Sequence, residues 1–338
     1  MQKTPKQMNV ALIGAGIFAR DAHLPAWAKL RDRAHIAAVW SRTRANAEAL
    51  AATLPGPVQV ADDLAALLAN PEIDAVDIVL PIDAQAAIIE QALAAGKHVV
   101  SEKPIAATSA QAQDLIALWE RTDRVWMVAE NWRYERAFQH AAALVHDGAI
   151  GAPVTVSWGL HLPVDPANKY YHTAWRRSGQ FQGGFLLDGG VHHVAAMRSI
   201  LGDVAAVRAE ARQFSPELPP ADTMSATLHF AGGAIGSYLV SYAVRSAWEE
   251  PLHIVGTDGS LRVTVAGLDV AQIGGQLVRH EAPPRDGVDV ELEAFVAAVL
   301  DGAPHLDTPS EALRDLAVIE AMLKSAQSGH MEYVAQVA

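Results

Sequence analysis

The sequence predicts an α/β protein in which a doubly wound parallel sheet is followed by an α+β domain with an open, mainly antiparallel sheet. Short apolar runs alternate with helix-like segments from residue 9 to residue 129, which is typical of a parallel sheet covered on both faces. After residue 129 the chain is instead rich in β-type runs joined by turns. Because 338 residues fit about two domains, we place the domains at residues 1–128 and 129–338.

The first domain is expected to alternate strand and helix. Its strand-like runs are nearly continuously apolar, and the segments between them have the spacing of amphipathic helices. Gly96 stands where a helix C-terminus favours glycine, and Thr108 or Ser109 can cap the helix that begins there. The expected strands are residues 9–13, 35–40, 58–60, 75–80, 98–100 and 125–129, and the expected helices are residues 17–30, 44–53, 64–68, 84–95 and 109–121.

The second domain is expected to contain antiparallel strands and several helices. Asp258-Gly259 is a strong hairpin signal between two of the strands. Residues 234–244 are apolar on both faces, including Ile235 and Leu239, so we expect a homodimer or homotetramer through this sheet, although a loop of the same chain could cover it instead. The expected strands are residues 153–162, 225–230, 234–244, 252–256 and 261–265, and the expected helices are residues 138–147, 188–201, 292–300 and 310–325.

Charge and composition exclude several classes of protein. The chain has 26 Lys and Arg against 38 Asp and Glu, so its net charge of −12 disfavours nucleic acid and anionic membranes as partners. It has no cysteine, which excludes disulfides, thiolate-bound metals and a cysteine nucleophile. Its apolar runs are far shorter than the roughly 18 residues that a membrane span needs, so no span is expected.

The N-terminal residues superficially resemble a signal peptide, because Lys3 and Lys6 precede an apolar stretch. That stretch is short, contains glycines and is followed by Arg20 and Asp21 instead of a small-residue cleavage site. We therefore expect a cytoplasmic protein.

A glycine-rich loop follows the first expected strand and leads directly into a helix. It reads G-x-G-x-x-A: the first glycine allows the tight turn, the second lets the backbone approach a pyrophosphate, and the small last residue allows close packing of helix on strand. A purely structural turn can also use two glycines, but the flanking strands and helix favour a Rossmann dinucleotide-binding loop. The predicted cofactor contacts here are Gly14, Gly16, Ile17, Phe18 and Ala19.

The end of the second expected strand bears on the choice between NAD and NADP. An acidic residue there would bind the ribose 2′-hydroxyl, whereas this chain has Ser41 and Arg42, with Arg44 close behind. A 2′-phosphate meets no carboxylate there and can pair with a guanidinium, so NADP is favoured. NAD stays possible because an arginine can also stack on adenine, and a solvated helix start is the alternative interpretation.

Lys103 follows the expected strand 98–100. The carboxyl ends of strands in an open parallel sheet face the ligand crevice, so this lysine is predicted to lie near the nicotinamide. In a partly desolvated cleft a lysine becomes useful as a hydrogen-bond donor or acid/base partner, although a Glu-Lys pair is more ordinarily a solvated turn. Glu102, Leu80 and Pro81, which end or follow strands of the same sheet, are also predicted cofactor contacts.

A second group of candidate residues lies between Gly183 and His193. On a helix Asp188 and His192 are four residues apart and share a face, where a carboxylate can hold an imidazole in one tautomer and raise its basicity. His193 falls on another face, and no third ligand has a metal-binding spacing, so no metal is expected. A histidine pair satisfied within the core is the alternative interpretation.

With these motifs, the chain resembles the glucose–fructose oxidoreductase / inositol dehydrogenase family (Gfo/Idh/MocA) over essentially its whole length. Four separated signals occur in the order found in the family. They are the glycine loop 14–19, Glu102-Lys103-Pro104, Ala129-Glu130-Asn131 with Tyr134, and Trp175-Arg176 followed by Gly183, Gly184, Asp188, Gly189 and His192. The resemblance implies that Lys103, Asp188 and His192 are catalytic and that the Lys103–Pro104 bond is cis.

The resemblance also implies which residues line the nicotinamide and substrate pocket. Asn131 and Arg176 match positions that contact cofactor and substrate, and nearby aromatic residues would suit a sugar ring or, equally, an ordinary core. The chain departs from the family at Gln85, where a His is common, and at Ala195, where sugar and inositol dehydrogenases often have Asp; the second change argues against plain inositol or glucose. The predicted substrate contacts are Lys103, Asn131, Tyr134, Trp175, Arg176, Asp188 and His192.

The predicted function is an NAD(P)-dependent oxidoreductase that transfers a hydride between a nicotinamide cofactor and a secondary hydroxyl or carbonyl of a sugar-like substrate. His192, held by Asp188, is the expected general base or acid, and Lys103 is expected to stabilise charge on the reacting oxygen. Two alternatives stay open: an NAD-dependent glycosidase acting by transient oxidation and elimination, and a non-catalytic sugar or nucleotide sensor on the same fold.

Overall fold

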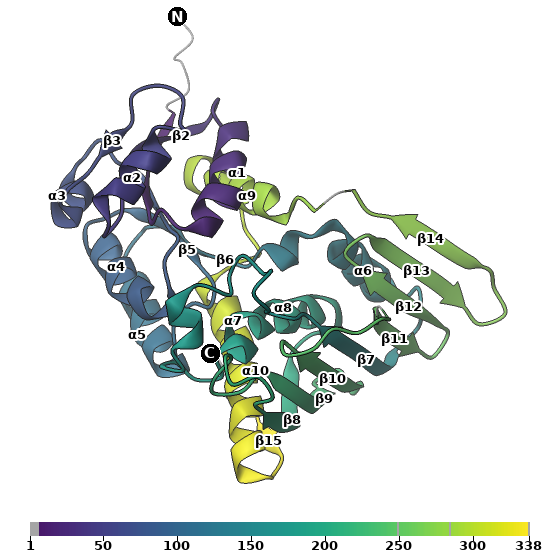
Figure 1. Ribbon diagram of the computed structural model, residues 1–338. Helices are drawn as coiled ribbons and strands as arrows, with labels where there is room; N and C mark the ends of the chain where they lie inside the picture. The colour runs from purple at the N-terminus through teal and green to yellow at the C-terminus, as the bar shows by residue number, and fades with distance from the viewer. Residues whose placement is uncertain (1–6, 249, 284, 337–338) are drawn as a thin grey trace, which may run out of the picture. The chain divides into compact units, whose positions relative to one another are not determined.

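The structure is a computed structural model that describes residues 7–248, 250–283 and 285–336 (Figure 1). Within these residues the chain divides into two compact units. The first unit comprises the residues up to 130 together with Val288–Glu311, and the second comprises Asn131–Gly287 and the residues from Ala312 onward. Lys3 and Lys6, which entered the interpretation of the N-terminus, lie outside the described residues.

The first unit contains a six-stranded parallel sheet. Its strands are β1 (Met8–Ile13), β2 (Ala34–Trp40), β3 (Gln59–Val60), β4 (Ala75–Ile78), β5 (His98–Glu102) and β6 (Trp126–Ala129). The strand order β3-β2-β1-β4-β5-β6 is that of a Rossmann fold, with every neighbouring pair parallel. The prediction of a doubly wound parallel sheet is therefore confirmed, with β4 ending two residues earlier and β5 two residues later than expected.

The helices of this unit follow the expected alternation. They are the π-helical turn η1 (Ala19–His23), α1 (Leu24–Lys29), α2 (Arg44–Ala51), α3 (Leu64–Ala69), α4 (Ile82–Ala94), α5 (Ser109–Trp119) and α9 (Gly287–Asp301). The first helical stretch begins at Ile17, as expected, and continues through the π-helical turn that starts at Ala19. Thr108, not Ser109, caps α5, since its side chain accepts a hydrogen bond from the backbone N–H of Gln111.

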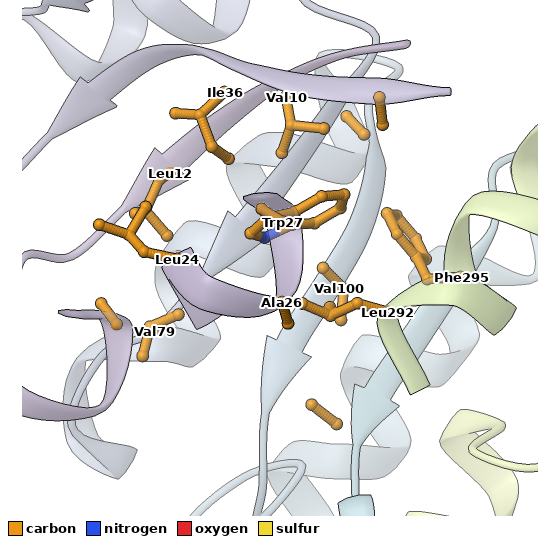
Figure 2. Packing of buried hydrophobic residues seen from close by; sticks show 14 of the residues in the cluster. Val10, Leu12, Leu24, Ala26, Trp27, Ile36, Val79, Val100, Leu292 and Phe295 are labelled. Carbon is orange, nitrogen blue, oxygen red and sulfur yellow. The ribbon is translucent and has the colours of Figure 1, made fainter. Parts of the chain in front are cut away.

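Helix α9 differs from the expected division of the chain, which assigned it to the second domain. Leu292, Phe295 and Val296 of α9 are fully buried in the core of the first unit, where Phe295 and Leu292 pack with Trp27 and Val100 (Figure 2). Fully burying a side chain of this size contributes about 1.5–3 kcal/mol. The apolar face of α9 therefore fixes Val288–Glu311 to the first unit despite the distance in sequence.

The second unit contains a nine-stranded sheet. Its strands are β7 (Pro153–His161), β8 (Val204–Arg212), β9 (Thr223–Phe230), β10 (Ile235–Ser241), β11 (Leu252–Gly256), β12 (Gly259–Thr264), β13 (Gly267–Gln272), β14 (Leu277–Glu281) and β15 (Glu332–Tyr333). They lie in the order β14-β13-β12-β11-β7-β10-β9-β8-β15, and among the described residues only β7 and β10 pair in parallel. The mainly antiparallel sheet is confirmed, but β8, β13, β14 and β15 were not predicted.

The helical segments of the second unit are η2 (Asn131–Tyr134), α6 (Arg136–His146), η3 (Ala174–Arg177), α7 (Phe185–Asp188), α8 (Gly190–Leu201) and α10 (Pro309–Ser328). The expected helix over residues 188–201 is thus two consecutive helices that meet at Gly189, whose backbone keeps helical angles. Across the described part of the chain, no helix has both the length and the apolar character required to cross a bilayer.

The two faces of β7 and β10 differ more than the sequence suggested. Trp158, Tyr238 and Val240 are buried on one face. On the other face the register places Ser237 beside Ser157, and both are exposed. The expectation that β10 is apolar on both faces is therefore wrong in part, because its outer face alternates serine with Ile235 and Leu239.

Candidate active site

The glycine loop after β1 has the geometry that a pyrophosphate requires. Gly14 has φ +114°, and a Cβ there would lie 2.2 Å from the carbonyl oxygen of Val79, so only glycine fits. A Cβ at Gly16 would meet no atom within 4 Å, which leaves open space at the backbone for a ligand. Ala19 is fully buried, as close packing of helix on strand demands. These residues fit a dinucleotide.

Ser41 and Arg42 follow β2 at the edge where a dinucleotide's ribose is bound in this fold. Ser41 is half-buried and Arg42 is exposed. Arg44 is already engaged, because its Nε donates to Glu48 at 2.8 Å and its guanidinium also pairs with Asp62. Within the described residues Arg42 makes no hydrogen bond or ion pair, so of the two arginines it is the one available to a ligand.

The remaining predicted contacts of the first unit stand at the carboxyl ends of β4 and β5. Leu80 lies next to the glycine loop, since a Cβ at Gly14 would be 3.2 Å from its Cδ2, and Pro81 caps α4. Lys103 directly follows β5, is half-buried, and is joined to Pro104 by a cis peptide bond, as the resemblance implied. The structure therefore brings these residues to one edge of the parallel sheet.

In the second unit, Asp188 is bound by an arginine. Asp188 is 6 % exposed, and its Oδ2 accepts a hydrogen bond of 2.7 Å from Nε of Arg176. The Arg176 guanidinium carbon also lies 4.1 Å from the ring centroid of Trp175 and 4.7 Å from that of Tyr170. Arg176 thus connects the aromatic segment around η3 to the end of α7. Tyr170 was not singled out from the sequence, since a lone loop tyrosine carries no periodic signal.

The adjacent histidines of α8 have different surroundings. His193 is 1 % exposed, and its Nδ1 is 2.7 Å from the hydroxyl of Tyr238. His192 is partly exposed, and its ring stacks on Trp132 with a centroid distance of 5.4 Å and an interplanar angle of 15°. His193 is therefore a core histidine whose hydrogen bond is made within the protein, which was the alternative interpretation. His192 is instead exposed enough to contact a ligand. Tyr134, a predicted substrate contact, is buried, and Asn131 is half-buried.

Tyr242 is a further residue near Asp188 that sequence reasoning missed. A Cβ at Gly189 would lie 2.1 Å from the Tyr242 hydroxyl, so the glycine makes room for it. That hydroxyl is buried and has no hydrogen-bond partner among the described residues. Burial, with the neighbouring Tyr238 and Asp188, raises the pKa of Tyr242 well above its ordinary value, so the phenol stays protonated.

Comparison with known families identifies the chain. Residues 8–130 match the oxidoreductase family, NAD-binding Rossmann fold, and residues 142–335 match the oxidoreductase family, C-terminal alpha/beta domain. The chain belongs to the Gfo/Idh/MocA family. The resemblance inferred from the motifs is thereby confirmed, and the protein is an oxidoreductase that binds a nicotinamide cofactor.

Full-length relatives support this membership. The dehydrogenase FPY6 of Fusarium mangiferae is 34 % identical, over 97 % of this chain and 99 % of its own. The D-apiose dehydrogenase of Paraburkholderia graminis is 29 % identical, over 96 % of this chain and 89 % of its own. A crystal structure of an oxidoreductase from Thermotoga maritima has a TM-score of 0.93 and 37 % identity, covering 98 % of this chain and all of that one. This Gfo/Idh/MocA protein thus shares both domains with its relatives.

Proposed function

We propose that this protein is a sugar dehydrogenase that prefers NADP and uses Lys103, Asp188 and His192 as its catalytic residues. The observation that carries the proposal is the arrangement at the start of α8. There a buried carboxylate and a partly exposed imidazole stand on consecutive helical turns, while the neighbouring His193 is committed to Tyr238. Full-length similarity to a D-apiose dehydrogenase supports a sugar as the substrate class.

In the proposed mechanism His192 accepts the hydroxyl proton as a C–H bond of the substrate is oxidised. The Asp188 carboxylate favours the charged imidazolium that results, and Arg176 keeps that carboxylate oriented. Lys103 donates a hydrogen bond to the reacting oxygen and stabilises its developing negative charge. The nicotinamide, when bound, supplies the hydride acceptor.

The function is tested by adding a panel of pentoses, hexoses and anhydrosugars to the protein with NADP+ or NAD+ and following the absorbance of the reduced cofactor. A dehydrogenase gives a steady increase with at least one sugar. A glycosidase that oxidises only transiently releases an aglycone from a glycoside with no net reduced cofactor, and a sensor binds a sugar without turnover. Either of these last two results would contradict the proposal.

Ser41→Asp should reverse the cofactor preference. The new carboxylate would stand beside the position we propose for the 2′-phosphate and repel it, while offering a hydrogen-bond acceptor to the ribose of NAD. We expect the ratio of kcat/KM for NADP to that for NAD to fall at least about tenfold, which corresponds to about 1.4 kcal/mol. Steady-state kinetics with both cofactors measure this ratio.

Arg42 and Arg44 provide a matched pair of variants that also tests which residues bind the 2′-phosphate of NADP. Arg42→Ala should weaken NADP selectively, whereas Arg44→Ala should have less effect because Arg44 is engaged by Glu48 and Asp62. Equal losses for both cofactors in Arg42→Ala, together with an unchanged ratio in Ser41→Asp, would place the 2′ recognition elsewhere.

We also propose that two copies of the chain associate through the outer face of the nine-stranded sheet. Its central strands β7 and β10 present exposed serines there, Ser157 and Ser237, together with Ile235, which is 51 % exposed. A face that combines an exposed apolar side chain with small polar ones can pack against a second copy of itself. Ser237→Glu should therefore shift the sedimentation coefficient to that of a monomer, whereas Gln91→Glu on the exposed side of α4 should not. A monomeric wild-type protein would contradict the proposal.

A further inference from the structure

The first unit contains a buried histidine whose two ring nitrogens both face carboxylates. His23 ends η1 and is fully buried. Its Nδ1 lies 2.8 Å from Oδ2 of Asp77 on β4, and its Nε2 lies 3.0 Å from Oε1 of Glu102 at the end of β5. Oδ2 of Asp77 also accepts a hydrogen bond of 2.7 Å from Nε1 of Trp27. One side chain therefore ties the helical turn after the glycine loop to two strands.

This geometry calls for a proton on each nitrogen of the ring. A neutral imidazole donates only one hydrogen bond, which would leave its other nitrogen facing a carboxylate oxygen, lone pair against lone pair. Burial alone would lower the pKa of His23, but the charges and hydrogen bonds of Asp77 and Glu102 outweigh burial and raise it well above its ordinary value. The ring is therefore an imidazolium at neutral pH and donates to both carboxylates.

The charged groups around His23 come from three elements. Asp77 lies on β4, Glu102 on β5 and Glu291 on α9. Burial, followed by the charges of Asp307 and Glu102, raises the pKa of Glu291 well above its ordinary value. Asp77 and Glu102 are the two carboxyl groups within hydrogen-bond distance of the ring nitrogens. In the described part of the chain these acids are not arranged to hold a metal ion.

Lys103 lies between two residues that buried side chains hold in place. Glu102, which precedes it, is bound by His23. Pro104, which follows it, accepts a hydrogen bond of 2.5 Å at its carbonyl oxygen from Nε2 of the fully buried Gln85. The backbone is therefore anchored on both sides of Lys103, and a displacement of Glu102 would reach the lysine through a single peptide bond.

We propose that His23 is a positioning residue for the reaction: by donating to Asp77 and Glu102 together, it fixes the strand end that presents Lys103. The inference rests on the proposed function, in which Lys103 stabilises the reacting oxygen. Because His23 is fully buried, it acts through Glu102 and not on the substrate. Loss of one proton from the ring breaks one of the two hydrogen bonds, so the placement of Lys103 depends on the protonation of His23.

The test follows the reactivity of Lys103 as the pH is raised, using the full-length protein. A brief pulse of acetic anhydride, with peptide mass spectrometry, reports the labelling of Lys103 relative to the exposed Lys29 without requiring turnover. In the wild type this ratio should change in a step where His23 loses its proton. Asp77→Asn removes one charge that retains the proton, so the step should move to lower pH by at least about one unit, a tenfold change in proton affinity.

Asp74→Asn is the matched control, because Asp74 immediately precedes β4 and its carboxylate accepts a hydrogen bond of 2.9 Å from the backbone N–H of Asn9. It should leave the step in place. His23→Gln should abolish the step and, once a sugar substrate is known, lower kcat about tenfold with a smaller change in KM. A step unmoved by Asp77→Asn, or retained in His23→Gln, overturns the inference.

A measurement on the wild type removes any dependence on whether the variants fold. In a ¹⁵N-histidine spectrum, His23 should carry protons on both ring nitrogens at pH 7, and a neutral tautomer there overturns the inference. If no sugar is oxidised, the proposed function fails, whereas labelling and the spectrum still decide the role of His23.

Discussion

Lys103→Ala should lower kcat by about 10²- to 10³-fold, the loss typical of removing one donor to a developing oxyanion. In the proposed mechanism the lysine interacts most strongly with the reacting oxygen as charge develops on it, so the loss should fall on kcat more than on KM for the sugar. The affinity for NADP+ should change little, because the glycine loop and Ser41 are untouched. Initial rates and a fluorescence titration of the cofactor measure the two effects.

Lys29→Ala is the control for removing a lysine from the same unit. Lys29 is 64 % exposed and pairs with Asp289 at 2.5 Å, an exposed ion pair whose contribution to stability is small. Its removal should leave kcat unchanged. Lys103→Arg keeps a positive charge but changes the shape and reach of the donor, so it should recover only part of the activity. Full activity in Lys103→Ala would refute the assigned role.

Much of the first unit could be predicted because its strands carry a local signal. Strands such as β1 and β4 are almost entirely buried and read as mostly apolar runs, each with one polar residue, Asn9 and Asp77. The position of α9 could not be predicted in this way. Its apolar face gives a helix, but the choice of core depends on packing against Trp27 and Val100, which lie far away in the sequence.

The strands that escaped prediction lack that local signal. β8 reads VAAVRAEAR, in which Ala, Arg and Glu have high helix propensity and outnumber the two valines, and its strand conformation comes from pairing with β9. β14 is exposed along most of its length, so no buried face gives it a period of two. In both cases the tertiary partner, and not the sequence of the strand, determines the structure.

In the candidate site, too, some features can be read from the local sequence, whereas others depend on residues that are distant in the sequence. Gly14, Lys103, Asp188 and His192 stand in short motifs whose chemistry can be read from neighbouring residues. The side chains that hold the motifs in place are not adjacent to them: His23 is 79 residues from Glu102 in the sequence. Residues that contact ligands were therefore easier to nominate than those that orient them.

His192→Ala should lower kcat by about 10²- to 10⁴-fold, the range typical of a lost general base. The part of the pH dependence of kcat/KM that is due to this base should also be lost in the variant. The variant should remain folded, since His192 is partly exposed and its main ring contact, with Trp132, lies at the edge of the core. Thermal unfolding and a pH series of initial rates on the same preparation separate the two effects.

His193→Ala, at the adjacent position, should lower the stability of the protein and leave its turnover largely intact, the opposite of what is expected for His192→Ala. Removing this buried ring leaves the Tyr238 hydroxyl without its partner at 2.7 Å, which costs about 1–3 kcal/mol of the free energy of unfolding. The fraction of the variant that folds should keep most of its kcat, because its proposed base is intact. If His193→Ala instead loses turnover and His192→Ala retains it, the assignment of the base is wrong, because the two histidines would have exchanged their structural and chemical roles.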